Sequence, residues 1–267
     1  MTGPERTAPV WAGVDLGGTG TRVVVVGADG VELSGTTVAS SSFGGAPVDE
    51  LADLVLALVP DHARLLGVGV GASGPVNLRT GEIRNPDTLP RFSGLDVAGG
   101  LARRTGTPAW IDNDAVVAGL AEAAWGAAAG SASVLCVTLG TGIGAAMIQG
   151  RLPVLPADGQ HPEGGHIAVA GAGSPCYCGL PQCWEQVASR SALDRLRADV
   201  GGDEVALWAE YARRLAGGLV TLLTLYHPGC VVIGGGVAQH WSSLEQPLRL
   251  ALAGFREFDA SRPLLAS

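Results

Sequence analysis

The stretch VWAGVDLGGTGTRVVVV, residues 10–26, has the pattern of a buried strand, a turn of Gly and Thr, and a second strand. The same order of features returns at residues 134–149, which read VLCVTLGTGIGAAMIQ. Tight glycine turns of this kind present backbone N–H groups that can hold an anion. One such hairpin is also typical of an ordinary turn, but two copies favour an internal duplication with one phosphate-binding hairpin in each half.

The remaining hydrophobic pattern alternates short apolar runs with helical periodicity, which predicts an α/β protein. We expect two lobes, a smaller one over residues 1–114 and a larger one over residues 115–267. Helices are expected over 47–59, 95–104, 115–129, 184–197, 203–225 and 243–252, the fifth of them interrupted near Gly217 and Gly218, and a last short strand over 262–266.

One segment of the second half, residues 163–185, reads EGGHIAVAGAGSPCYCGLPQCWE. One His and three Cys form a donor set that suits tetrahedral Zn²⁺, which accepts thiolate sulfur and imidazole nitrogen. The other interpretation is a loop of buried or disulfide-bonded cysteines. Glu163 and Glu185 stand at the two ends of this segment, which we call the zinc loop. A metal bound in the loop would therefore hold their carboxylates in fixed positions.

The composition narrows the classes of function. A net charge of −8 argues against nucleic acid or a membrane surface as partner. The 17 basic residues are all Arg, which excludes a Schiff-base lysine and a Walker-type phosphate loop. The N-terminal residues lack a signal pattern and no apolar run is long enough to span a bilayer, so we expect a cytoplasmic protein.

Each of two short motifs has two possible interpretations. Asp114, in the motif DNDA at residues 112–115, follows an expected strand and precedes an expected helix. It can simply cap that helix, or it can face the crevice where open α/β sheets bind ligands. The glycine run at 234–236 can bring backbone close to a flat ligand, or it can be a plain strand-to-helix turn. His62, His161 and His240 have no evident partners and are expected at the surface.

These motifs together resemble the ROK family of repressors and sugar kinases, within the actin-like ATPase superfamily. The matching segments, which cover nearly the whole chain in the family's order, are DLGGTGTR at 15–22, SGPV at 73–76, DNDA at 112–115, LGTGIG at 139–144, EGGH at 163–166, CYCGLPQCWE at 176–185 and VIGGG at 232–236. The segment 183–193 is similar to bacterial glucokinases. The resemblance implies an actin-like, ribonuclease H-like fold in which each lobe is a mixed sheet flanked by helices.

The resemblance also implies a set of residue roles for an ATP-dependent sugar kinase. Asp114 would be the general base for a sugar 6-hydroxyl. The residues that would bind sugar hydroxyls are Asn113, Glu163, His166 and Glu185. The residues that would contact ATP and Mg²⁺ are Asp15, Gly17, Gly18, Thr19, Thr141, Gly142, Gly234 and Gly235. The ligands of a structural Zn²⁺ would be His166, Cys176, Cys178 and Cys183. The first phosphate hairpin departs from many relatives, because Gly20 stands where they carry Lys.

The expected reaction is the conversion of glucose to glucose 6-phosphate. Alternatives are a kinase for N-acetylmannosamine, N-acetylglucosamine or a cyclitol, and a non-catalytic sugar-binding ROK protein. ROK repressors carry an N-terminal helix-turn-helix, which we do not expect because the first strand begins near Val10. Family members are commonly dimers or tetramers, so a homo-oligomer is expected. The phosphoryl donor is ATP or polyphosphate.

Overall fold

The computed structural model describes residues 8–171, 174–255 and 261–267. The chain divides into two compact units, each with its own sheet and core. Unit 1 comprises residues 1–117 and 155–161, and unit 2 comprises residues 118–154 and 162–267. The short segment 155–161 therefore belongs to the first unit, although the residues on both sides of it belong to the second.

Unit 1 is built on a five-stranded mixed sheet with the strand order β3-β2-β1-β4-β7. The pairs β1/β2 and β2/β3 are antiparallel, while β1/β4 and β4/β7 are parallel. The strands are β1 (Ala8–Leu16), β2 (Gly20–Gly27), β3 (Glu32–Ala39), β4 (Ala63–Ala72) and β7 (Ala109–Asn113), with a small hairpin of β5 (Val76–Asn77) and β6 (Glu82–Ile83) beside them. A turn at Asp29 and Gly30 joins β2 to β3, and the dipeptide Asp-Gly is typical of such hairpin turns.

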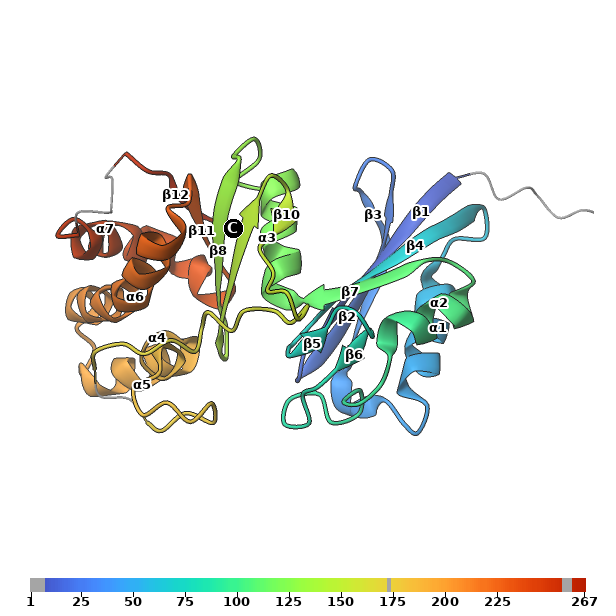
Figure 1. The fold of residues 1–267 in the computed structure, drawn as a ribbon, viewed down its shortest axis with the longest axis horizontal. Helices are drawn as coiled ribbons and strands as arrows, with labels where there is room; N and C mark the ends of the chain where they lie inside the picture. The colour runs from blue at the N-terminus through green and yellow to red at the C-terminus, as the bar shows by residue number, and fades with distance from the viewer. Residues whose placement is uncertain (1–7, 172–173, 256–260) are drawn as a thin grey trace, which may run out of the picture. The chain divides into compact units, whose positions relative to one another are not determined.

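Helices α1 (Pro47–Leu58) and α2 (Val97–Thr105) lie side by side on one face of this sheet (Figure 1). Alternate residues of β1, from Val10 to Leu16, point toward these helices and are buried. The same alternation places the side chains between them, such as Trp11 and Asp15, on the other face. Hydrophobic burial thus fixes which residues of β1 face away from the helices.

Unit 2 repeats the plan of unit 1. Its sheet has the order β10-β9-β8-β11-β12, again with two antiparallel pairs followed by two parallel pairs. The strands are β8 (Ser133–Leu139), β9 (Ile143–Gln149), β10 (Leu152–Pro153), β11 (Cys230–Gly234) and β12 (Leu264–Ala266). The identical succession of pairings is the structural counterpart of the repeated Gly/Thr hairpins, and the expectation of a mixed sheet flanked by helices in each half is confirmed.

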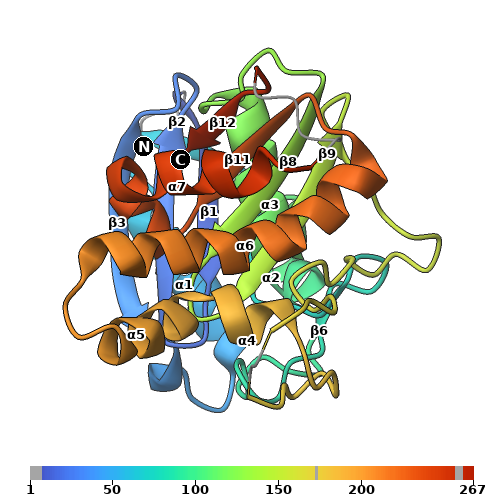
Figure 2. The same cartoon turned by 90° about the vertical axis from the view of Figure 1, so that its left-hand side faces the viewer.

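Helices cover both faces of the second sheet. The long helix α6 (Glu204–Tyr226) crosses one face with α7 (Trp241–Leu252) alongside it (Figure 2). On the other face α3 (Asp114–Ala124), which begins in unit 1, brings Gly119 against Cys136 and Ile148. The two remaining helices are α4 (Trp184–Ala188) and α5 (Arg190–Asp199).

Four expectations need correction. The helix expected over 115–129 ends at Ala124, and turns follow it. The expected helix over 184–197 is two helices, because Ser189 is extended and its hydroxyl caps α5 by accepting from the Ala192 N–H at 3.3 Å. The interruption expected at Gly217 and Gly218 is absent, since α6 continues through both residues. Gly218 serves packing instead: a Cβ there would lie 2.1 Å from the buried indole of Trp184.

His161 is also not a surface residue. Its side chain is only 7% exposed, and neither ring nitrogen has a hydrogen-bond partner among the described residues. Burial lowers the pKa of this imidazole to about 4. A lone His flanked by polar residues gives no sequence signal of burial, because the residues that enclose it come from elsewhere in the chain.

Candidate active site

Asp114 stands where β7 ends and α3 begins, at the carboxyl end of the parallel strands of unit 1. Its Oδ2 accepts a hydrogen bond from the Ser73 hydroxyl at 3.3 Å, and its Oδ1 accepts from the Ala115 N–H at 2.8 Å. Burial raises the pKa of Asp114 and the charge of Asp15 adds to the effect, while the two hydrogen bonds oppose it. A carboxylate with a raised pKa is a better proton acceptor near neutral pH.

The two residues before Asp114 support this turn. Asn113 is buried, and its Oδ1 also accepts from the Ala115 N–H, at 2.9 Å. Asp112 accepts from the Asn113 N–H at 2.7 Å, and burial raises the pKa of the Asp112 carboxyl as well. Capping of the helix is thus shared by two side chains, so the helix alone does not require the carboxylate of Asp114.

Asp15 belongs to the same edge of the first sheet. It pairs in register with Gly71 of β4, which in turn pairs with Asp112 of β7. Burial raises the pKa of Asp15, an effect that the nearby Arg22 opposes. Unit 1 therefore brings Asp15 and Asp114 to one edge of its sheet, where doubly wound α/β sheets hold their ligands.

The turn that follows Asp15 is closely packed. Gly17 donates its N–H to the carbonyl of Gly20 at 3.2 Å, which closes the hairpin before Thr19 leads into β2. A Cβ at Gly18 would lie 2.4 Å from the methyl group of Thr88, so no larger residue fits there without movement. The first phosphate hairpin is thereby held against the loop 85–88 of the same unit.

The second hairpin, in unit 2, is tied to the zinc loop through Glu185. The Glu185 Oε2 accepts from the Ile143 N–H at 3.1 Å, and a Cβ on Gly142 would lie 2.3 Å from this oxygen. Glycine at position 142 is thus what admits the carboxylate to the hairpin. The Thr141 carbonyl accepts from the Ser191 hydroxyl at 3.4 Å, which fastens the hairpin to α5.

The four residues expected to bind zinc come together in unit 2. The ligand atoms of His166, Cys176, Cys178 and Cys183 all lie within 4.8 Å of one another. The His166 Nδ1 is 3.3 Å from the Cys183 sulfur and 3.6 Å from the Cys176 sulfur. All five cysteines of the chain are free thiols, which removes the disulfide interpretation.

The chemistry of this donor set fits a divalent metal. Burial first, and then the adjacent Cys176 and Cys178, raise the pKa of the Cys183 thiol to about 12, although a backbone N–H at Glu185 opposes this. Three thiols at such close range cannot all be deprotonated unless a cation joins them, and a neutral imidazole completes the donor set for such a cation. A bound Zn²⁺ resolves this conflict, and His166 would contribute Nδ1.

The other nitrogen of His166 faces away from the thiols. Nε2 lies 2.9 Å from the Tyr177 hydroxyl and 3.9 Å from the Glu185 Oε2. The backbone brings these groups together, because the Gly165 carbonyl accepts from the Glu185 N–H at 3.2 Å. Glu163 begins the same turn, and its carbonyl accepts from the His166 N–H at 2.9 Å.

The glycine run after β11 lies beside the second hairpin. Gly235 has a φ of 82°, and a Cβ there would lie 2.6 Å from the Leu139 carbonyl oxygen. Leu139 ends β8 directly before the hairpin 140–142. Gly234 and Gly235 thus lie close to the backbone that leads into this hairpin. This packing by itself would require a glycine, whether or not a ligand binds there.

Sequence reasoning missed three polar residues that the structure places beside these groups. Ser73 lies in the quoted motif at 73–76 but has no predicted role there. Tyr177 lies between two of the cysteines, and Arg190 lies within the expected helix over 184–197. For Tyr177 the available signal was its place inside the metal loop. Ser73 directly follows a buried strand, and Arg190 directly follows a Ser that can cap a helix.

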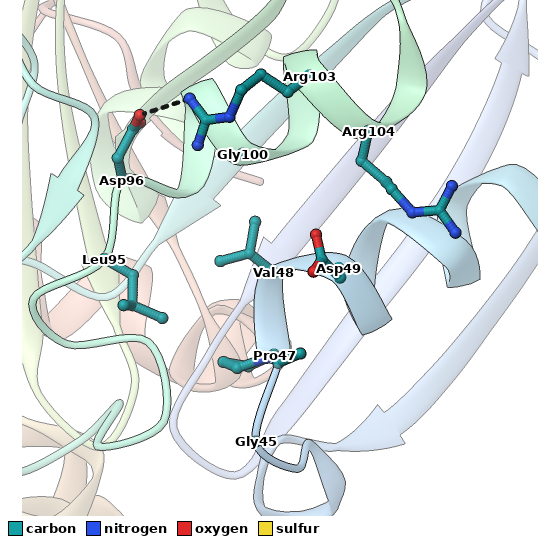
Figure 3. A pocket seen from close by; sticks show the side chains of 10 residues that line it. Gly45, Pro47, Val48, Asp49, Leu95, Asp96, Gly100, Arg103 and Arg104 are labelled. Atoms are coloured by element: carbon teal, nitrogen blue, oxygen red, sulfur yellow. Dashed lines mark hydrogen bonds and ion pairs between the residues drawn. The ribbon is translucent and has the colours of Figure 1, made fainter.

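A surface pocket of about 450 Å³ lies elsewhere in unit 1, where the start of α1 meets α2 (Figure 3). Its arginines are paired: Arg103 with Asp96 at 3.5 Å, and Arg104 with Asp53 at 2.6 Å. None of the predicted site residues lines it. In the part of the chain that the structure describes, no helix has the length and apolar character needed to cross a membrane.

Comparison with known proteins supports one family. Residues 11–255 match the model of the ROK family. A glucokinase of Streptomyces coelicolor is 31% identical over 272 residues, covering 89% of this chain and 85% of its own length. A ROK hexokinase of Thermus thermophilus has a TM-score of 0.79 at 31% identity, covering 96% of this chain and 92% of the other. A ROK family glucokinase of Streptomyces griseus, solved in complex with glucose and AMPPNP, has a TM-score of 0.79 at 28% identity, with coverages of 96% and 94%.

Proposed function

The chain belongs to the ROK family, and we propose that it is an ATP-dependent hexokinase that phosphorylates glucose at the 6-hydroxyl. The observation that carries the proposal is the position of Asp114, a half-buried carboxylate with a raised pKa at the edge of the first sheet where α/β sheets bind ligands. The glucokinases among the relatives, one of them solved with glucose and AMPPNP, support the substrate and the donor.

Phosphoryl transfer depends on positioning and on the neutralisation of charge more than on covalent chemistry. We propose that Asp114 accepts the proton of the attacking 6-hydroxyl, a contribution of roughly 10²–10⁴-fold. The Ser73 hydroxyl would keep the carboxylate oriented through its hydrogen bond to Oδ2. Asn113 would bind a neighbouring sugar hydroxyl from the same turn.

Unit 2 supplies the other proposed sugar contacts. Glu163, His166 and Glu185 lie on backbone that is joined by the hydrogen bonds of the zinc loop. A Zn²⁺ held by His166, Cys176, Cys178 and Cys183 would supply structural rigidity to the backbone that carries Glu163 and Glu185.

The donor would be held by both glycine hairpins. Asp15 would hold Mg²⁺, directly or through water, and the backbone N–H groups of Gly17, Gly18 and Thr19 would contact phosphate oxygens. Thr141 and Gly142 would do the same in unit 2, and Gly234 with Gly235 would approach the nucleoside. Bound Mg²⁺ supplies charge neutralisation on the phosphate chain.

Two further features belong to the same proposal. A homo-oligomer, either a dimer or a tetramer, is proposed because members of the family commonly form one. Light scattering measures the number of subunits. A cytoplasmic location is proposed from the clustered free thiols, which persist in reducing compartments.

The deciding experiment is a coupled assay over a panel of hexoses and N-acetylhexosamines, with Mg·ATP and with polyphosphate as donors. We expect glucose to give the highest kcat/KM with ATP. A folded, zinc-containing protein that phosphorylates no sugar would refute the proposal and would favour a non-catalytic sugar binder. A preference for N-acetylmannosamine would leave the reaction intact but correct the substrate.

A further inference from the structure

A phosphate chain carries several negative charges, and sites that hold one usually contain Lys or Arg. The chain has no Lys, and the turn of the first glycine hairpin, residues 17–20, contains no basic residue. Arg22, the nearest cation in sequence, is engaged in an ion pair of 2.9 Å with Glu32. The residues so far assigned to the donor therefore include no uncommitted positive side chain.

In unit 2, Arg190 provides an uncommitted positive side chain. It is the first residue of α5, directly after the capping Ser189. Its backbone N–H donates to the Gly140 carbonyl at 2.9 Å, and its Nη1 lies 3.1 Å from where a Cβ on Gly236 would stand. One residue thus touches both the second phosphate hairpin and the glycine run after β11.

The guanidinium group of Arg190 has no other evident task. It forms no hydrogen bond or ion pair with another described residue. The other arginines of α5 are engaged, Arg195 with the Gln186 carbonyl at 2.8 Å and Arg197 with Glu204 at 3.6 Å. The exposed, unpaired guanidinium lies beside the glycine run, and the backbone of the same residue is bonded to the second hairpin, so it is available to a ligand that binds over both segments.

We propose that Arg190 binds the phosphate chain of the donor, at the point where the hairpin 140–142 and the glycine run 234–236 meet. This inference rests on the proposed kinase function and adds a specific side chain to it. Nη1 and the other guanidinium N–H groups would donate charge-assisted hydrogen bonds to phosphate oxygens. The start of α5 adds a partial positive charge of the same sign. Two sources share this chemistry: the triphosphate of ATP and an inorganic polyphosphate.

The test measures donor binding directly. The unchanged protein, Arg190→Ala, Arg190→Lys and the control Arg197→Ala are titrated by calorimetry with Mg·AMPPNP, with polyphosphate and with glucose. We expect Arg190→Ala to weaken binding of the phosphate-containing probe about tenfold, the usual effect of losing a hydrogen bond to a charged group, and to leave glucose binding within twofold. Arg190→Lys should restore part of the lost affinity, because lysine keeps the positive charge but lacks the several N–H donors of the planar guanidinium.

The outcomes separate this inference from the proposed function. A loss for AMPPNP identifies the nucleotide's phosphate chain as the ligand, and a loss for polyphosphate alone identifies the inorganic chain. Unchanged binding of both probes by folded Arg190→Ala, or an equal loss in Arg197→Ala, would overturn the role of Arg190 while leaving the kinase intact. Failure of the unchanged protein to bind either probe would overturn both.

Discussion

The Tyr177 hydroxyl lies 2.9 Å from Nε2 of His166, the ring nitrogen that does not face the cysteine thiols. The two rings meet edge to face, with centroids 5.0 Å apart. A His that binds a metal through one nitrogen commonly gives its other N–H to a polar partner, which fixes the ring and strengthens the ligand. Tyr177 is placed to be that partner, although it is not itself a metal ligand.

We therefore predict that Tyr177→Phe keeps about one zinc per chain but lowers zinc affinity roughly tenfold, at the lower end of the usual effect of such partners. Competition with a chelator measures the affinity, and elemental analysis measures the stoichiometry. Tyr226→Phe is the matched control. An unchanged affinity in Tyr177→Phe would show that Glu185 or water fixes the ring instead.

Asp114→Asn should lower kcat by roughly 10²–10⁴-fold, because an amide cannot accept the proton of the sugar hydroxyl. The Kd for glucose should change little, since the amide keeps the size of the side chain and a hydrogen-bonding oxygen. Asp112→Asn is the control in the same turn, and its amide oxygen can still accept from the Asn113 N–H. If Asp114→Asn turns over at the rate of this control, another group is the base.

The pH dependence gives an independent check on the same carboxyl. Protonated Asp114 cannot act as a base, so kcat/KM should fall as the pH drops through its pKa. The Ser73 hydrogen bond favours the charged form and lowers that pKa, in opposition to burial. Ser73→Ala should therefore move the acidic limb of the pH profile to higher pH. A limb that stays in place, or moves to lower pH, would contradict this arrangement.

Much of this architecture can be predicted from short windows of the sequence. The strands that flank both hairpins have unbroken apolar runs with glycine turns, and the donor set of the zinc loop is identifiable from Cys and His alone. Helix boundaries were harder, because the break at Ser189 depends on a side-chain cap and the continuity at Gly218 depends on the indole of Trp184. The contact of Gly218 with Trp184 is tertiary and lies outside any local window of sequence. The Ser189 cap is local, and its signal is a Ser three residues before Ala192.

The contact between Gly142 and Glu185 predicts a sharp steric effect. Gly142→Ala would place a methyl group 2.3 Å from the Glu185 Oε2, which must then leave the Ile143 N–H. We expect a loss of about 1–3 kcal/mol in the free energy of unfolding, the usual cost of an unsatisfied buried donor. KM should rise for both glucose and ATP, because the carboxylate and the hairpin move together. Gly140→Ala is the control in the same turn, since nothing lies within 4 Å of a Cβ there.

His161 predicts a dependence of stability on pH that is separate from catalysis. Its pKa is lowered from 6.5 to about 4 in the folded chain, because burial disfavours the charged imidazole and no described group pairs with it. Above pH 6.5 both the folded and the unfolded chain hold it neutral. Between pH 6.5 and 4 only the unfolded chain binds the proton, so stability is lost as the pH falls, by up to about 3 kcal/mol. Urea unfolding at pH 7.5 and pH 5 should show this loss in the unchanged protein and a smaller one in His161→Leu. The exposed His62 is the control, and equal pH dependence in His161→Leu and His62→Leu would show that the buried imidazole is not the source.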